Sequence, residues 1–255
     1  MGGDTLDAFH RGAFWLVQPA TGAHRAGMDA MMLAAAVPGD FSGRLADLGA
    51  GAGAAGLAVA ARCAHARVTL VERSPEMAAY ARRTLEHPGN AAIASRAEIL
   101  EADVALRGAA RRNAGLDDRA FDFAIMNPPF NDDRHRPAAT ELRRDAHVMV
   151  AGLFESWLRC AAAIVKPGGR VALIARPASL GEVLTALSGR FGRARIVPIQ
   201  PRADRAAIRI VIRAERGARA GPSLEPPLVL HEGRANVFTE HADAINNGRA
   251  ALLSD

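Results

Sequence analysis

The sequence predicts an α/β fold with a doubly wound, mostly parallel sheet that ends in an antiparallel hairpin. Apolar strand-like segments alternate with helical segments along the chain, and short turns connect them. The first strand runs directly into a glycine-rich turn and then into a helix, as in the βαβ units of such sheets. The last two apolar strands follow each other without an intervening helix, which predicts the hairpin.

The strands are short apolar runs bounded by polar or glycine-rich segments. Residues 121–126 (FDFAIM) are the clearest example. By the same criterion we expect strands over residues 44–48, 68–72, 97–104, 121–126 and 170–175, and a hairpin formed by 195–198 and 206–212. A short extended piece is expected at 228–231.

The helices are indicated by capping residues and by apolar spacing. Ser74 is a good N-cap, and Pro75 follows it at the first helical position, where the missing N–H costs nothing. Phe154 and Trp157 lie at helical spacing and predict a buried helix face. We expect helices over residues 28–37, 54–62, 75–86, 142–165 and 180–188, and a polar, loop-like and partly helical segment over 107–119.

The length suits one large domain with small additions at both ends. We expect an N-terminal arm and helix over residues 1–40 that cover the ligand site, a central domain over 41–216 and a C-terminal extension over 217–255. The chain has 49% hydrophobic and 23% charged residues, and this composition excludes a disordered or collagen-like protein. No apolar run approaches the roughly 20 residues of a membrane span, and no secretory signal is evident, so a cytoplasmic protein is expected.

The cysteines and histidines predict neither a disulfide framework nor a metal site. Cys63 and Cys160 are far apart in alanine-rich helical segments, and the histidines are scattered without metal-ligand spacing. We therefore expect no metal cofactor.

Arginine dominates the positive charge: the formal net charge is +5, and Lys166 is the only lysine. A GC-rich coding bias explains the choice of arginine, but not its clustering. Clustered arginines suit a phosphate backbone, although a solvated helix face gives the same pattern. The clusters are Arg134, Arg136, Arg143 and Arg144, and Arg202, Arg205, Arg209, Arg213, Arg216 and Arg219.

The glycine-rich turn follows Asp47 and contains Gly49, Gly51 and Gly53. Together with Gly56 it matches the dinucleotide fingerprint, and Glu72 stands about 20 residues further on, so an oxidoreductase is one alternative. Asp47 argues against it, because a carboxylate there would repel a pyrophosphate. The same carboxylate is complementary to the amino group and sulfonium of S-adenosylmethionine.

The sequence Asn127-Pro128-Pro129-Phe130 directly follows the apolar strand at 121–126. Proline has no N–H and holds the preceding residue extended, so this turn presents hydrogen-bond acceptors. The Asn127 side-chain oxygen and the Pro128 carbonyl can hold the two hydrogens of an exocyclic amine, and Phe130 can stack on its ring. Orientation would then supply the catalysis without a strong general base. An ordinary turn with an aromatic plug is the structural alternative.

Together, LADLGAGAG at 45–53, Glu72, Asp103 and NPPF at 127–130 resemble the class I S-adenosylmethionine-dependent methyltransferases that act on exocyclic amines. Residues 18–33 (QPATGAHRAGMDAMML) resemble the N-terminal signature of the tRNA1(Val) adenine-N6 methyltransferases, and LVLHE at 228–232 followed by FTE at 238–240 resembles their C-terminal segment. The resemblance spans about residues 10–245.

The resemblance implies a role for each matching residue. Asp47, Gly49, Gly51 and Gly53 would line the methionine part of the cofactor, Glu72 would bind the ribose, and Asp103 the adenine. Asn127 to Phe130 would hold the target amine. Arg25 and Asp29 would close over the cofactor, although a salt bridge or a helix cap explains these two residues equally well. For Asp103, the alternative is that it caps a helix. His147 fits the pattern without an evident role.

The implied partner is RNA, most specifically an adenine in a tRNA anticodon loop, bound through the arginine clusters. Scarce lysine and a short polar C-terminus depart from the family and put the RNA target in doubt. NPPF also occurs in ribosomal RNA guanine-N2 enzymes, and NPPY in protein glutamine methyltransferases. A non-catalytic RNA-binding module is a further alternative. The oligomeric state stays open.

Overall fold

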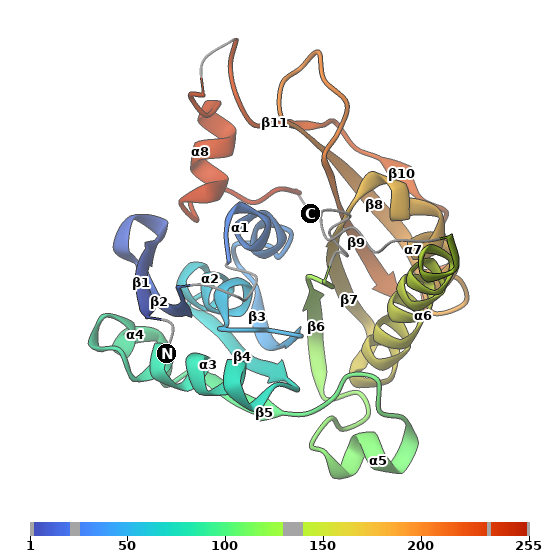
Figure 1. Ribbon diagram of the computed structural model, residues 1–255, viewed down its shortest axis with the longest axis horizontal. Coiled ribbons are helices and arrows are strands. Elements are labelled where there is room, and N and C mark those ends of the chain that lie inside the picture. Colours follow the sequence, from blue (N-terminus) through green and yellow to red (C-terminus); the bar gives the residue numbers. More distant parts are fainter. Residues whose placement is uncertain (1–2, 21–25, 130–139, 234–235, 254–255) are drawn as a thin grey trace.

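The computed structural model describes residues 3–20, 26–129, 140–233 and 236–253, with residues 140–151 described as backbone only. The main sheet has nine strands in the order β10-β8-β9-β7-β6-β3-β4-β5, and β11 pairs with β8 (Figure 1). The strands are β3 (Ser42–Leu48), β4 (His65–Glu72), β5 (Ala97–Glu101), β6 (Phe121–Met126), β7 (Val165–Ala175), β8 (Phe191–Gln200), β9 (Arg209–Arg216), β10 (Ser223–Leu224) and β11 (Leu228–Val229).

Strands β5, β4, β3, β6 and β7 pair in parallel, and β9 is antiparallel to both β7 and β8. The doubly wound, mostly parallel sheet and its antiparallel hairpin are therefore confirmed. The order reverses at β3, which lies between β4 and β6. Ligands of such sheets bind at this switch point, at the carboxyl ends of the strands.

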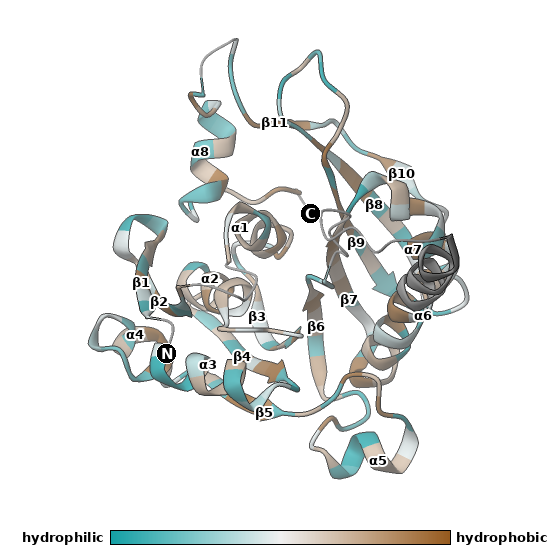
Figure 2. Cartoon of the chain, viewed as in Figure 1, coloured by the Kyte–Doolittle hydropathy of each residue, from teal (hydrophilic) through white to brown (hydrophobic). Residues whose placement is uncertain are grey.

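Helices cover both faces of the sheet, with α1 and α2 on one face and α6 and α7 on the other (Figure 1). Alternate residues of β6 face alternate layers: Phe123 and Ile125 pack with α1 and α2, whereas Ala124 and Met126 pack with α6. Figure 2 shows the apolar residues gathered in the central strands. The α-helices are α1 (Met28–Ala35), α2 (Ala54–Arg62), α3 (Pro75–Glu86), α4 (Ala91–Ala94), α5 (Gly108–Asn113), α6 (Thr140–Ile164), α7 (Leu180–Leu187) and α8 (Glu240–Asn246).

The N-terminal arm contains a hairpin that the sequence analysis did not predict. Strands β1 (Asp4–Phe9) and β2 (Phe14–Pro19) pair with each other and form a separate two-stranded sheet. Asn90 holds β2 in place: its Oδ1 accepts from the Trp15 N–H and its Nδ2 donates to the Trp15 carbonyl, each at 2.8 Å. Polar side chains from elsewhere in the chain specify this contact, so local periodicity gives no sign of it.

The other differences from the expected elements are small. Strand β5 ends at Glu101 and not at residue 104. Strand β7 begins at Val165 and includes residues 166–169, where its pairing with β6 shifts register. Part of 107–119 is helical, as α5. The C-terminal extension contains α8, for which the sequence analysis predicted no helix.

The C-terminal end of α1 is bound by three distant segments. Arg62 Nη1 donates to the carbonyls of Ala34 and Val37 at 2.7 and 3.2 Å. The Leu252 N–H donates to the Ala35 carbonyl at 2.7 Å, and Arg213 Nη1 to the Ala36 carbonyl at 3.4 Å. Three of these four carbonyls accept from arginine side chains and one from a backbone N–H, which suits the unpaired carbonyls and negative end of a helix.

Within the described residues, we find no helix with the length and apolar character that crossing a membrane requires.

Candidate active site

A cavity of about 730 Å³ lies at the carboxyl ends of β3, β4, β5 and β6. The start of α1, one turn of α6 and the first residue of β9 complete its walls. Its polar and charged lining residues are Gln18, Asp29, Asp47, Glu72, Arg73, Ser74, Asp103, Asn127, Ser156 and Arg209.

The glycine turn after β3 takes a backbone that only glycine adopts easily. Gly49, Gly51 and Gly53 have φ of 74°, 58° and 97°. At Gly49 a second constraint acts, because a Cβ atom there would overlap the indole ring of Trp157. Gly49 and Gly51 line the cavity, and Gly53 caps α2 directly behind them.

Asp47 is a buried carboxylate at the end of β3. Its Oδ2 accepts a hydrogen bond from the Gly56 N–H at 2.8 Å. Burial raises the pKa of Asp47 to about 7; the bond from Gly56 opposes this shift, and the nearby Glu72 carboxylate adds to it. The group is therefore poised to ionise when a cation enters the cavity.

Glu72 joins the end of β4 to the glycine turn. Its Oε2 accepts from the Gly51 N–H at 2.9 Å, and its Oε1 accepts from the Ser74 N–H at 2.8 Å. Ser74 in turn caps α3, as the sequence predicted, with its Oγ accepting from the Met77 N–H at 3.3 Å. Backbone donors therefore fix this carboxylate on the cavity wall.

Asp103 lies after β5 and also lines the cavity. Its Oδ1 accepts from the Ala105 N–H, two residues on, at 2.8 Å. This is a local turn of the Asx type, and α5 begins only at Gly108, so Asp103 does not cap that helix.

The turn after β6 reaches the same cavity. Asn127, Pro128 and Pro129 all line it; Asn127 is partly buried, Pro128 is buried and Pro129 is exposed. Phe130 lies outside the described residues. The structure thus brings together Asp47, the glycine turn, Glu72, Asp103 and Asn127, while their individual roles stay predictions.

Asp29 also lines the cavity, where it pairs with Arg209. Beside it, Gln18 Oε1 accepts from the Ala26 N–H at 2.8 Å and Gln18 Nε2 donates to Asp7 Oδ2 at 2.8 Å. Arg25 lies outside the described residues.

Sequence reasoning missed the wall contributed by α6, namely Leu153, Ser156 and Trp157. Helical spacing had marked Trp157 as a core residue. The apolar lining of a cavity has the same spacing, so only the fold distinguishes the two.

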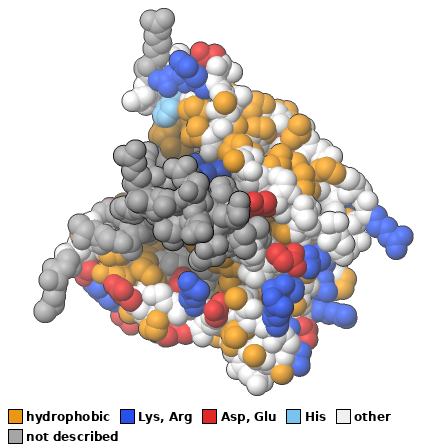
Figure 3. All heavy atoms as spheres, turned by 45° about the vertical axis from the view of Figure 1, so that its right-hand side comes forward, with side chains coloured by type: hydrophobic (Ala, Val, Ile, Leu, Met, Phe, Trp, Pro, Cys, Tyr) orange, Lys and Arg blue, Asp and Glu red, His pale blue; other side chains and the backbone are white. Residues whose placement is uncertain are grey.

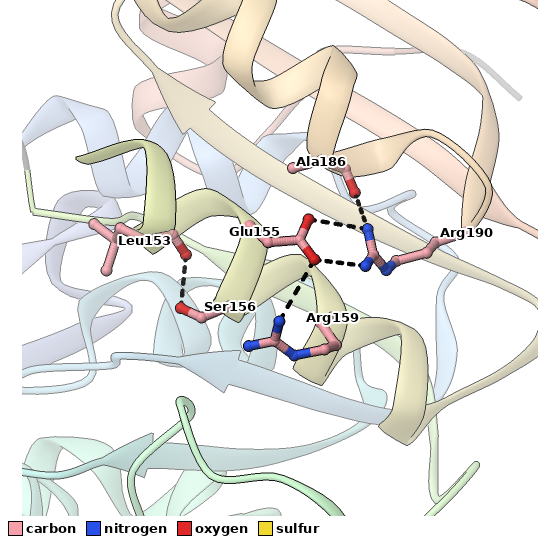
Figure 4. Close-up of polar contacts among 6 residues, drawn as sticks. All are labelled: Leu153, Glu155, Ser156, Arg159, Ala186 and Arg190. Carbon is pink, nitrogen blue, oxygen red and sulfur yellow. Dashed lines mark hydrogen bonds and ion pairs between the residues drawn. The ribbon is translucent and has the colours of Figure 1, made fainter. Parts of the chain in front are cut away.

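An ion pair anchors this part of α6 to the segment after α7 (Figure 4). Glu155 accepts from Arg190 at 2.6 and 3.0 Å, and the Arg190 Nη1 also donates to the Ala186 carbonyl at 2.9 Å. Arg159, one turn further along α6, lies 3.5 Å from the same carboxylate. On the adjacent side of the helix, Ser156 Oγ donates to the Leu153 carbonyl at 2.9 Å.

The structure divides the second arginine cluster between two ends of the sheet. Arg202 and Arg205 lie in the loop before β9 and Arg209 at its start, whereas Arg216 and Arg219 lie at or beyond its far end. Arg213 is only 5% exposed, and Arg216 Nη1 donates to the Val165 carbonyl. The side chains of Arg134, Arg136, Arg143, Arg144 and His147 lie outside the described part.

Among the described residues, no group of His, Cys, Asp and Glu side chains is arranged to hold a metal ion. Cys63 and Cys160 are both free and buried.

The parallel sheet with its switch at β3, the glycine turn and the cavity above it define a class I methyltransferase architecture. The chain belongs to the methyltransferase small domain family, whose sequence profile matches residues 23–201. No curated protein matches the chain.

Three solved structures illustrate the likeness. A predicted O-methyltransferase from Agrobacterium tumefaciens is 48% identical, with a TM-score of 0.77 over 88% of this chain and 97% of that one. The T. thermophilus 16S rRNA N2 methyltransferase RsmC, solved with AdoMet and guanosine, is 21% identical, with a TM-score of 0.56 over 84% of this chain and 50% of that one. A SAM-dependent O-methyltransferase from Thermotoga maritima is 18% identical, with a TM-score of 0.52 over 78% and 68%. The last two show a shared fold alone.

Proposed function

We propose that this methyltransferase uses S-adenosylmethionine to methylate the exocyclic N6 amine of an adenine in tRNA. The observation that carries the proposal is that Asn127 and Pro128 line the same cavity as Asp47, Glu72 and the glycine turn. A methyl donor and a planar amine would therefore meet in one cavity.

The charge of the cavity lining suits the cofactor. Its described lining carries four carboxylates, those of Asp29, Asp47, Glu72 and Asp103, and two arginines, Arg73 and Arg209. This acidic balance suits a ligand with an amino group and a sulfonium. When bound, S-adenosylmethionine supplies a methyl group on a positively charged sulfur. Gly49 and Gly51 let the backbone approach it closely.

The contribution of Asn127 and Pro128 is to orient the acceptor. The Asn127 side-chain oxygen and the Pro128 carbonyl accept the two amine hydrogens, which directs the nitrogen lone pair toward the donor. The nitrogen would gain the methyl group as the donor's sulfur–methyl bond breaks, and the proton that the nitrogen loses would pass to water. Asp47, Glu72 and Asp103 already accept hydrogen bonds from backbone N–H groups, which favours orientation of the amine over a general base as the source of catalysis.

The choice of adenine over other planar amines rests on the sequence resemblance. The acceptor pair Asn127 and Pro128 also suits guanine N2 or a protein glutamine amide. A hydroxyl acceptor, as the name of the A. tumefaciens relative indicates for that protein, has one hydrogen instead of two and would use only half of the pair. Unpaired RNA loops favour the proposal, because a base leaves such a loop at modest cost.

The test is to incubate the protein with methyl-labelled S-adenosylmethionine and unmodified total tRNA, and to identify the labelled nucleosides by mass spectrometry. N6-methyladenosine is the expected product. Labelled guanosine or 2′-O-methylribose in place of N6-methyladenosine would contradict the adenine assignment and identify another acceptor.

Two asparagine variants test the mechanism in the same assay. Asn127→Ala should reduce methyl transfer at least about a hundredfold while cofactor affinity stays within about twofold, since it removes an acceptor of the amine. Asn113→Ala is the matched control, because Asn113 is exposed at the end of α5 and outside the cavity lining. Undiminished transfer by Asn127→Ala would exclude this mechanism.

A further inference from the structure

The apolar lining of the cavity divides into two walls. Met28, Ala30 and Ala54 belong to the apolar cluster of α1 and α2. Val71, Ala102, Val104 and Trp157 belong to the cluster on the opposite face of the sheet, together with α6. Only the second wall contains an aromatic ring among the described lining residues.

The second wall is formed by the ends of β4 and β5. Val71 precedes Glu72, and its carbonyl accepts from the N–H groups of Gly49 and Ala50 at 2.8 and 3.0 Å. The Ala102 N–H donates to the Glu72 carbonyl at 3.1 Å, directly before Asp103. This wall therefore lies beside the two carboxylates for which the resemblance implies ribose and adenine contacts.

Trp157 is the largest member of this wall. The closeness of its indole to Gly49 fixes it against the glycine turn, and 9% of the residue stays accessible. The indole gives this wall a flat aromatic surface, against which a flat ring of a ligand can pack.

The ion pair of Glu155 with Arg190 holds the helix turn that carries Trp157. Both Arg190 distances to the carboxylate are 3.0 Å or less, and Arg190 itself is tied to the Ala186 carbonyl (Figure 4). A two-bond arginine–carboxylate contact fixes orientation as well as distance. Glu155 and Arg190 are outside the cavity lining and would act only through the position of α6.

We propose that Trp157 binds the adenosine half of the cofactor, with its ring against the adenine, and that Glu155 and Arg190 position it. The inference rests on the proposed cofactor and is independent of the acceptor. Trp157 is thereby assigned to recognition of the methyl donor instead of the hydrophobic core alone.

Intrinsic fluorescence provides a direct test, because the chain has two tryptophans and Trp15 is in the N-terminal hairpin outside the cavity lining. In the full-length Trp15→Phe variant, all tryptophan emission comes from Trp157. Adenosine and S-adenosylhomocysteine should change that emission saturably, whereas methionine alone should not. Unchanged emission on saturation with S-adenosylhomocysteine, with binding proven by calorimetry, would overturn the proposal.

Affinity measurements distinguish a direct contact of Trp157 with the ligand from a contribution of this residue to folding alone. Trp157→Leu should raise the Kd for S-adenosylhomocysteine at least about tenfold, in line with the loss of one aromatic contact to a base, and Trp157→Phe should raise it less. Phe154→Leu is the matched control, because Phe154 is buried on the same helix outside the cavity lining; it should lower the thermal midpoint and leave Kd unchanged. Equal Kd values for Trp157→Leu and the wild type would overturn the contact.

The role of Glu155 and Arg190 in positioning Trp157 can be measured separately. Glu155→Gln should shift the Trp157 emission maximum in the Trp15→Phe background and raise the adenosine Kd several-fold, and an unshifted spectrum with an unchanged Kd would exclude it. These assays use no RNA. If the protein does not methylate tRNA, only the proposed function is overturned. If substitutions of Trp157 leave adenosine binding unchanged, only this inference is overturned.

Discussion

Asp29 and Arg209 are 180 residues apart in sequence and form an ion pair on the cavity wall, with Arg209 Nε 2.8 Å from Asp29 Oδ2. The pair joins the start of α1 to the start of β9. An N-terminal helix and the antiparallel strand therefore meet at the ligand site, which explains how the N-terminal region contributes to a cavity built mainly by the central strands.

We expect this pair to matter more for binding than for stability. Both side chains are partly exposed, so the pair should contribute about 1 kcal/mol or less to the free energy of unfolding. A double-mutant cycle with Asp29→Asn and Arg209→Gln, measured on cofactor Kd and on urea unfolding, should show coupling in both. Additive effects on Kd would exclude a joint role.

Gly49→Ala should damage the cofactor site. The positive φ alone costs about 1–2 kcal/mol for an L residue, and the new methyl group would also displace Trp157. We expect a lower thermal midpoint and at least tenfold weaker S-adenosylhomocysteine binding by calorimetry. Gly181→Ala in α7 is the control, since its Cβ meets open space and should be neutral or stabilising. Wild-type binding by Gly49→Ala would contradict the geometry of the turn.

Asp47 predicts a pH dependence of cofactor binding. Its pKa is raised to about 7 by burial, so the side chain is largely protonated at pH 6 in the free protein. A cationic ligand favours the carboxylate, so binding at pH 6 should release a proton, and Kd should fall as pH rises toward 7 and level off above it. Calorimetry in buffers of different ionisation enthalpy measures the proton release. Asp47→Asn should abolish both effects; proton uptake on binding would refute this interpretation.

The divided arginine cluster predicts which arginines bind RNA. The loop between β8 and β9 is at the upper end of the molecule in Figure 1, and Figure 3 shows basic side chains at that end. Arg205 in this loop is 70% exposed, and Arg193 near the opposite end of β9 is 66% exposed. Arg205→Gln should weaken tRNA binding. It should also reduce the slope of log Kd against the logarithm of the salt concentration by about one. Arg193→Gln should change neither the affinity nor this slope. An equal loss of tRNA affinity in the two variants would contradict the prediction, because it would show that RNA is attracted by the overall positive charge and not by this loop.

The sequence predicted the sheet and most of the site because their signals are local. FDFAIM delimited β6 at its exact ends, and Ser74 with Pro75 located the start of α3. Asp47 and Glu72 lie at the carboxyl ends of β3 and β4, and the other predicted cavity residues, Gly49, Gly51, Asp103 and 127–129, come just after strands. The rule that parallel sheets bind ligands at their carboxyl ends was therefore sufficient to find them.

The remaining features depend on contacts between distant segments. Strands β1 and β2 depend on Asn90, and Trp157 faces a cavity that exists only once α6 packs beside Gly49. The arginines of 202–219 form one cluster along the chain, but an antiparallel strand separates them in space. Linear spacing carries no information about such separations.

The bonds at the C-terminal end of α1 have a consequence for the cavity at its other end. The helix has eight residues and is about 12 Å long, so it behaves as a short rigid rod between two attachment points. Arg62, Arg213 and Leu252 set the position and tilt of that rod without being part of the cavity lining. We therefore expect substitutions of Arg213 in β9, or near Leu252, to reach the cavity through a displacement of Met28 and Asp29, so that the C-terminal extension acts mechanically as part of the central domain.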